Sequence, residues 1–189
     1  MVIDIGGGTT EIAVIALSGI VTDQSIRIAG DEFTNDIIDY MKRKHNILIG
    51  ERTAEQIKIN VGAAIADLAD APPKYAVNGR DMLTGIPKQV FTTHVEVAEA
   101  LDKSIAKIEE AVLKALEDTP PELSSDIYRT GIYLTGGGAL LRGLDRRMAA
   151  KTKLNVHIAD DPLRAVVRGT GIALKNSHKY SFLMDRKSI

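Results

Sequence analysis

The 189-residue sequence contains no cysteine and no tryptophan, and aromatic residues make up only 4% of it. The lack of cysteine excludes disulfides, thiolate zinc sites and cysteine nucleophiles, and it suits a reducing cytosol. With so few aromatic side chains, an aromatic platform for a sugar or a base is not expected. The four histidines are scattered without the spacing of metal ligands, and no serine lies in a nucleophile-elbow pattern.

Long apolar runs and an excess of charge of one sign are also missing. The longest apolar run near the N-terminus, Ile12 to Leu17, is too short to cross a bilayer, and we expect no signal peptide before it. The net charge is −1, so a nucleic-acid-binding surface is not expected. With 44% hydrophobic and 26% charged residues, the chain suits one globular domain or two small subdomains.

Two glycine loops, each following an apolar strand-like run, are the most informative feature. Each loop holds three successive glycines, which have no Cβ and therefore let backbone N–H groups approach phosphate oxygens closely. The pair predicts a nucleotide held between two loops of one domain. The predicted nucleotide-binding residues are Gly6, Gly7, Gly8, Thr9 and Thr10 in the first loop, and Gly136, Gly137, Gly138 and Ala139 in the second.

Asp4 ends the first predicted strand, where an unpaired charge is costly. A hydrated Mg²⁺ beside a polyphosphate compensates for such a charge, because Mg²⁺ keeps several waters and binds through one or two carboxylates plus phosphates. We therefore expect Asp4 to face Mg²⁺ through water. Neither glycine loop has the P-loop pattern or the dinucleotide-binding pattern, so ordinary P-loop and Rossmann enzymes are excluded.

The order of the predicted elements is β-β-β-α, then an insertion, then α-β-α-β-α, which indicates an α/β fold with a mixed sheet flanked by helices. Strands are expected at 2–5, 11–17, 20–28, 131–134 and 155–158, and a Ser18-Gly19 turn makes a hairpin of the second and third. Helices are expected from a cap at Asp31, at 50–61 with Thr53 as a candidate cap, at 95–116, 139–151 and 162–174, with a helical turn at 122–127.

These elements divide the chain into a larger and a smaller subdomain. Residues 1–47 and 93–175 form the larger one, and residues 48–92, with a hairpin-bearing segment at 74–92, form a small inserted subdomain. The tail, residues 176–189, is polar and basic and is expected to be poorly ordered.

At the two glycine loops and in several other segments, the chain resembles the actin–Hsp70–sugar-kinase ATPase superfamily, and within it the MreB family of bacterial actin homologues. Residues 4–11 resemble the family's second phosphate loop, 134–142 its adenosine motif, and 29–33 the turn after its third strand. The run 50–58 resembles the MreB helix whose Glu and Lys reach the ribose and adenine, which implies these roles for Glu55 and Lys58. Segments 120–123 and 160–163 also fit, and the match runs to about Leu174.

The resemblance implies an actin-like (ribonuclease H-like) ATPase domain that binds ATP and Mg²⁺. It covers only the second half of the family's fold, so we expect a fragment without the first phosphate loop, a further Mg²⁺-proximal Asp and the water-positioning Glu. In the half present, residues 6–9 would face the β- and γ-phosphates and residues 136–139 the α-phosphate and adenosine. We expect weak nucleotide binding, little or no ATP hydrolysis and no catalytic residue in this half.

For the whole protein, the resemblance implies a filament that controls rod cell shape and guides cell-wall synthesis. The implied partners are other subunits and the cell-wall elongation machinery with its membrane proteins. The implied location is cytoplasmic, at the inner face of the cell membrane, without direct membrane insertion by this half.

Other members of the superfamily are the alternatives. A sugar kinase or polyphosphate phosphatase has the same core but needs a carboxylate base and a substrate pocket. A chaperone ATPase, or a cell-division or pilus relative, is a third hypothesis. A chaperone would carry a long substrate-binding region after the adenosine motif, and only a short unassigned tail follows here.

Overall fold

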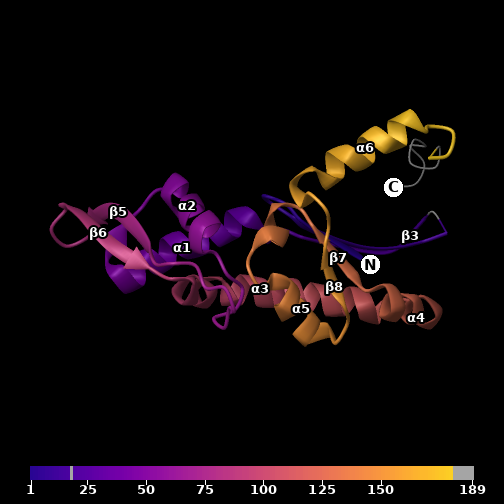
Figure 1. Cartoon of the computed structure of the whole chain (residues 1–189), viewed down its shortest axis with the longest axis horizontal. Coiled ribbons are helices and arrows are strands. Elements are labelled where there is room, and N and C mark those ends of the chain that lie inside the picture. The colour runs from indigo at the N-terminus through magenta and orange to yellow at the C-terminus, as the bar shows by residue number, and fades with distance from the viewer. Residues whose placement is uncertain (18, 181–189) are drawn as a thin grey trace.

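The computed structural model, which describes residues 1–17 and 19–180, contains a five-stranded mixed sheet (Figure 1). Its strand order is β3-β2-β1-β7-β8, with β1–β2 and β2–β3 antiparallel and β1–β7 and β7–β8 parallel. The mixed sheet predicted from the sequence is therefore confirmed. The strands are β1 (Val2–Ile5), β2 (Thr10–Ala16), β3 (Gly19–Ile26), β7 (Ile132–Thr135) and β8 (Val156–Ile158).

The long helix α3 (His94–Glu117) covers one face of this sheet. It begins with a capping box, in which Thr93 Oγ1 accepts from the Glu96 amide and the Glu96 carboxylate accepts from the Thr93 amide. Its predicted apolar face packs against the sheet, because alternate strand residues point toward it. The buried residues of the two layers include Ile3, Ile5, Ile12 and Val14 from the strands and Leu101, Ile105, Ile108 and Val112 from α3.

A smaller three-stranded sheet lies at one end of the molecule with two helices (Figure 1). The elements are β4 (Ile47–Leu48), β5 (Tyr75–Asp81), β6 (Pro87–Thr92), α1 (Gly30–His45) and α2 (Glu51–Val61). The β5–β6 hairpin confirms the one predicted in this region. Because α1 packs against α2, α3 and β4, its buried side chains join the same core as the large sheet. The subdomain boundaries at residues 48 and 92 stay a prediction.

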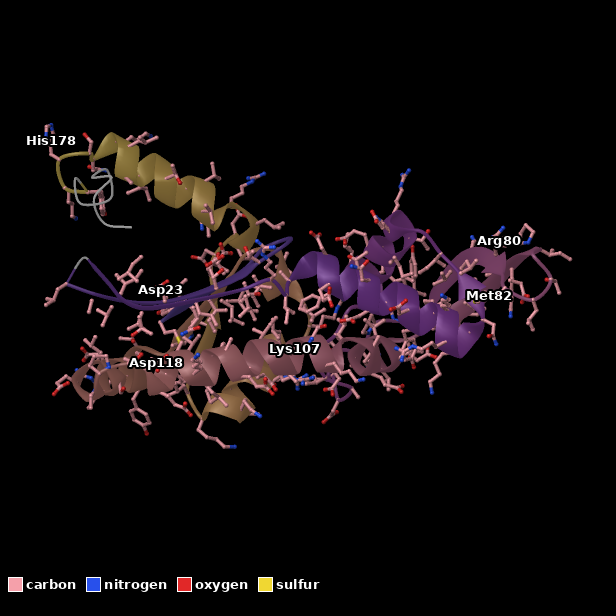
Figure 2. The ribbon with its side chains drawn as sticks, turned by 180° about the vertical axis from the view of Figure 1, so that it is seen from behind. Asp23, Arg80, Met82, Lys107, Asp118 and His178 are labelled. Carbon is pink, nitrogen blue, oxygen red and sulfur yellow. The ribbon has the colours of Figure 1, made fainter. Side chains whose placement is uncertain are left out.

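The two parts of the molecule lie at opposite ends of α3. Seen from behind, Arg80 and Met82 mark the hairpin end, whereas Asp23 on β3 lies at the other end beside Asp118 (Figure 2). There Gln24 Nε2 donates to Asp118 Oδ2 at 3.4 Å, which ties β3 to the end of α3.

The prediction of one continuous helix at 139–151 is wrong. The structure has a 3-10 turn, η1 (Gly137–Leu140), followed by α5 (Leu144–Thr152). The chain bends between them because Leu141 is extended and Gly143 has a φ of 75°. A Cβ on Gly143 would lie 2.6 Å from Ile65 Cγ1, so this bend is fixed by close packing.

The other predicted helices differ from the structure mainly at their ends. The predicted helix at 162–174 begins as the 3-10 turn η2 (Pro162–Arg164) and continues as α6 (Ala165–Lys175). The predicted turn at 122–127 is a longer helix, α4 (Pro121–Thr130). Neither Asp31 nor Thr53 caps a helix, because α1 and α2 begin after Ala29 and Gly50 without a side-chain cap.

The last described helix, α6, extends away from the sheet and buries none of its side chains (Figure 1). Residues 176–180 form turns after it. The rest of the tail predicted to be poorly ordered, and Ser18 of the predicted hairpin turn, lie outside the described residues. Within residues 1–17 and 19–180, no helix combines the length and the apolar character needed to span a membrane.

A buried ion pair joins α3 to α5. Glu109 is only 6% exposed, and Arg147 Nε donates to its carboxylate at 2.8 Å. Arg147 also reaches the exposed Asp102 at 2.8 Å and donates to Ala64 O at 3.1 Å. Removing one member of such a pair leaves an uncompensated buried charge, whereas removing both does not.

We therefore expect Arg147→Met to lower the free energy of unfolding by about 3–5 kcal/mol. The double variant Glu109→Met/Arg147→Met should recover much of this loss, because the unpaired carboxylate is gone. Urea unfolding followed by circular dichroism measures both values. A double variant less stable than Arg147→Met would show that the charge on Glu109 is not the cause.

Candidate functional site

The two glycine loops meet at one edge of the large sheet. Because β1 and β7 are parallel neighbours, their carboxyl ends lie at the same edge, and each loop begins directly after its strand. A Cβ on Gly136 would lie 2.4 Å from Ile5 O, and a Cβ on Gly138 would lie 2.2 Å from Ile5 Cγ2. The second loop is thus pressed against the end of β1, where the first loop starts.

The first loop turns its carbonyl groups inward. The Gly6 amide donates to Thr9 O at 3.0 Å, while the carbonyls of Gly6 and Gly7 accept from the amides of Gly30 and Asp31 at 3.1 and 2.7 Å. Within the described residues, the structure gives no hydrogen-bond partner to the amides of Gly7, Gly8 and Thr9, which lie on exposed residues. These three N–H groups are available to an anion, whereas that of Gly6 is not.

The fold itself does not require glycine at positions 7 and 8. Neither residue has a positive φ. A Cβ on either would meet nothing nearer than the Asp31 carboxylate, at 3.7 Å, which is ordinary van der Waals contact. Bare backbone at these two positions leaves room for a group from outside the chain to approach closely.

The second loop contributes two more free amides. The amide of Gly136, at φ 80°, donates to Pro162 O at 3.1 Å, and that of Ala139 donates to Gly136 O at 3.3 Å. The amides of Gly137 and Gly138 have no partner in the described part of the chain. Of the four predicted residues in this loop, these two can donate to a ligand, while the buried Ala139 fixes the turn.

Asp4 lies beside the second loop and has no ion-pair partner in the described residues. Its carboxylate is close enough to Gly136 that a Cβ there would lie 2.5 Å from Asp4 Oδ1. Burial raises the pKa of Asp4, and repulsion from Glu11, its partner on β2, raises this pKa further. No ion pair includes Asp4 in the described residues, and no three His, Cys, Asp or Glu side chains gather there as a metal site. A single unpaired carboxylate beside free amides fits a hydrated Mg²⁺ that is held mainly by phosphates.

The first turns of α1 and α2 border a pocket of about 500 Å³ beside the first loop. Asp31, whose carboxylate lies nearest to Gly7 and Gly8, is part of its wall. Three carboxylates against one guanidinium make this pocket acidic. The lining residues are Asp31, Thr34, Asn35, Glu51, Arg52 and Glu55.

Lys58 orients Glu55 and does not point a free donor into the pocket. Its Nζ lies 2.6 Å from Glu55 Oε2, 2.8 Å from Gly30 O and 3.0 Å from Thr34 Oγ1. An ammonium group has three donors, so these contacts use all of them. The predicted contact between Lys58 and a nucleotide would require one of these bonds to break.

The two threonines of the first loop have different roles. Thr10 is fully buried and its hydroxyl donates to Ile28 O at 2.6 Å, so its predicted contact with a ligand would require this bond to break and stays a prediction. Thr9 is exposed and its hydroxyl has no partner in the described residues. Asp31 borders the pocket but was not predicted as a site residue, because its place after Gly30 indicated a helix cap.

The chain matches a family model and several curated relatives. The family model described as MreB/Mbl protein matches residues 1–181. The cell shape-determining protein Mbl of Bacillus subtilis (strain 168) is 49% identical over 179 residues, which are 95% of this chain and 53% of that protein. The cell shape-determining protein MreB of Escherichia coli (strain K12) is 49% identical over 175 residues, or 93% and 50%. The chain thus spans about half the length of these relatives.

Solved structures show the same fold. MreB5 of Spiroplasma citri bound to AMPPNP has a TM-score of 0.90 at 39% identity, over 94% of this chain and 53% of that chain. A MamK filament has a TM-score of 0.73 at 21% identity, over 93% and 53%, and it supports the fold alone. These likenesses confirm the predicted actin-like class.

The contact between the two loops predicts how glycine substitutions affect stability. We expect Gly138→Ala to lower the free energy of unfolding by about 1–3 kcal/mol, because its Cβ would overlap the buried Ile5 side chain. Gly171→Ala in α6 is the matched control, since a Cβ there meets nothing within 4 Å and alanine favours a helix. Urea unfolding measures both variants, and equal stability of the two would contradict the observed loop contact.

Proposed function

Because the chain belongs to the MreB/Mbl family, we propose that it is the C-terminal half of an actin-like, filament-forming protein that determines cell shape, and that it forms one side of the nucleotide site. The curated relatives from Bacillus subtilis and Escherichia coli are named cell shape-determining proteins, which does not favour the alternative of a sugar kinase or polyphosphate phosphatase. Since the chain spans about half of these relatives, filament formation and cell-shape control are proposed here for the whole protein.

One observation carries the proposed nucleotide site: five amides without a protein partner lie on two adjoining loops at one sheet edge. Bare N–H groups at such an edge favour phosphate oxygens. The related MreB5 of Spiroplasma citri, solved with AMPPNP and with ADP, supports nucleotide as the ligand class. The five amides belong to Gly7, Gly8, Thr9, Gly137 and Gly138.

The distribution of charge sets the direction in which ATP would lie. Phosphates belong at the glycine loops, where the free amides lie, because α2 presents the carboxylates of Glu51 and Glu55 to the pocket and these repel anions. The same carboxylates accept hydrogen bonds from ribose hydroxyls and from an amino group of a base. Glu55, oriented by Lys58, is therefore assigned to the sugar and base, and Lys58 to supporting it.

Asp4 is assigned to Mg²⁺ through water. When bound, the ion would neutralise charge on the phosphates and relieve the cost of the unpaired Asp4 carboxylate. The chain's own residues bind and orient the nucleotide, and none of them is assigned to activating water, so no catalytic residue is proposed. Partnership with the cell-wall elongation machinery, and a place at the inner face of the membrane, rest on the family resemblance and are proposals of the same kind.

We expect the 189-residue chain to bind MgATP weakly, with the amide signals of Gly7, Gly8, Gly137 and Gly138 shifting in ¹⁵N–¹H NMR spectra. Gly7→Val should keep the spectrum of the folded chain and weaken the affinity about tenfold or more, because the side chain blocks the approach of phosphate. Gly169→Val in α6 is the control, since nothing lies within 4 Å of a Cβ there. Unchanged ATP affinity in Gly7→Val, or micromolar affinity of the chain alone, would contradict this assignment.

Filament formation is tested in a chimera in which this chain replaces the matching half of Bacillus subtilis Mbl. The chimera should sediment as polymer when MgATP is added, and the chimera carrying Gly7→Val should not, because the first loop would no longer accept phosphate. Mbl itself is the positive control. Sugar-dependent consumption of ATP, or release of phosphate from polyphosphate, without polymer would instead favour the enzymatic alternative.

A further inference from the structure

Two segments that are far apart in the sequence pack against each other behind the candidate site. The connector, residues 62–67, follows α2, and the post-loop segment, residues 141–147, follows the second glycine loop. Ala63 forms an isolated parallel bridge with Arg142, and the Ala64 amide donates to Arg142 O at 2.8 Å. A Cβ on Gly62 would lie 3.0 Å from Leu141 Cδ1, so the Leu141 side chain packs closely against the start of the connector.

The Arg142 side chain reaches the end of α2. Its Nη1 lies 3.4 Å from both Ile59 O and Gly62 O, and no other side chain in the described residues donates to these two carbonyls. The last carbonyls of a helix lack intrahelical partners and carry the negative end of the helix dipole. A guanidinium at this place therefore both bonds the final turn of α2 and complements its charge.

This contact joins the two ends of the proposed nucleotide site. α2 carries Glu55, which faces the acidic pocket, and Arg142 follows closely after the loop that presents the free amides of Gly137 and Gly138. A shift of α2 relative to the loop would change the distance between Glu55 and these amides. Lys58 fixes α2 against α1 on one side, and Arg142 fixes it against the second loop on the other.

We propose that Arg142 is a positioning residue that sets the span between Glu55 and the amides of Gly137 and Gly138, and so the fit of the nucleoside part of a nucleotide. This inference rests on the proposed nucleotide-binding function. It predicts that Arg142 affects ligands that reach both the loops and α2, and does not affect ligands that bind the loops alone.

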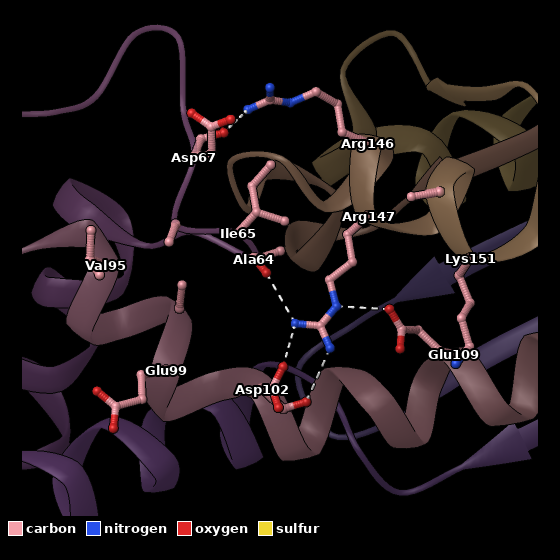
Figure 3. A pocket seen from close by; sticks show the side chains of 13 residues that line it. Ala64, Ile65, Asp67, Val95, Glu99, Asp102, Glu109, Arg146, Arg147 and Lys151 are labelled. Atoms are coloured by element: carbon pink, nitrogen blue, oxygen red, sulfur yellow. Dashed lines mark hydrogen bonds and ion pairs between the residues drawn. The ribbon is translucent and has the colours of Figure 1, made fainter.

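Other contacts hold the connector in place without Arg142. Arg146 Nη2 donates to Asp67 O at 2.9 Å, and Arg147 donates to Ala64 O at 3.1 Å (Figure 3). Both arginines lie on α5 and border a cavity of about 1040 Å³ on the side of the connector that Figure 3 shows. Because they bind the connector and not α2, loss of Arg142 leaves the connector attached and frees only the end of α2.

The test compares two ligands on the 189-residue chain by ¹⁵N–¹H NMR titration in Mg²⁺: ATP and inorganic tripolyphosphate. Arg142→Ala should weaken ATP binding about tenfold and leave tripolyphosphate binding unchanged, because the inorganic ligand does not reach α2. Arg142→Lys, which keeps a cation near the helix end, should restore part of the ATP affinity. Arg146→Ala is the matched control, and neither ligand should bind it differently from wild type.

The outcomes separate this inference from the proposed function. If wild type binds ATP and Arg142→Ala binds it equally well, or if Arg142→Ala weakens both ligands alike, the positioning role is overturned while nucleotide binding stands. If the wild-type chain binds neither ligand at its glycine loops, the proposed nucleotide site is overturned, and this inference with it. Spectra of the free variants show whether each one is folded.

Discussion

The parallel pairing of β1 with β7 is the contact on which the candidate site depends. Parallel neighbours end at the same sheet edge, so two loops from distant parts of the chain begin side by side. The second loop can pack this closely against the end of β1 only because Gly136 and Gly138 have no Cβ that would overlap Ile5. These two glycines keep the loops together, whereas Gly7 and Gly8 leave the surface open to a ligand.

The fold leaves specific polar groups without protein partners, and their arrangement supports the proposed nucleotide site. Buried backbone amides are nearly always paired within the protein. Here five amides on mostly exposed loops, with the unpaired carboxylate of Asp4, lie at one edge, and the acidic pocket along α1 and α2 lies beside them. The proposed donors for phosphate and the proposed acceptors for a sugar are thus separated in space, as one extended ligand requires.

The core of the molecule makes the two sheets one unit. Phe33, Ile37 and Met41 of α1 belong to the same buried cluster as the strands and α3, although α1 also packs on the small sheet. The close contact between the connector and the post-loop segment adds a second link, on the far side of α2. The position of α2 relative to the glycine loops is therefore fixed from two directions.

Much of this structure follows from local patterns that need no tertiary contacts. The 3-4 spacing of Leu101, Ile105, Ile108 and Val112 predicts α3, because it matches the helical period. The apolar, β-branched runs at 2–5 and 11–17 predict the first strands. Two interruptions of the predicted helices, at Gly143 and Arg164, were not predicted. The first arises from close packing of Gly143 against Ile65, and the second lies at the end of a 3-10 turn. Local sequence patterns do not encode tertiary contacts of this kind.

The sequence by itself determined the strand order along the chain, the glycine loops, the helical faces and the resemblance to a family. Only the tertiary structure decided which members of those loops can bind a ligand: it uses the Gly6 amide and the Thr10 hydroxyl within the fold, and leaves Gly7, Gly8 and Thr9 free. The tertiary structure also pairs Lys58 with Glu55, so that Lys58 orients the Glu55 carboxylate. The physical reason is that a donor's availability depends on which acceptors other segments bring within reach.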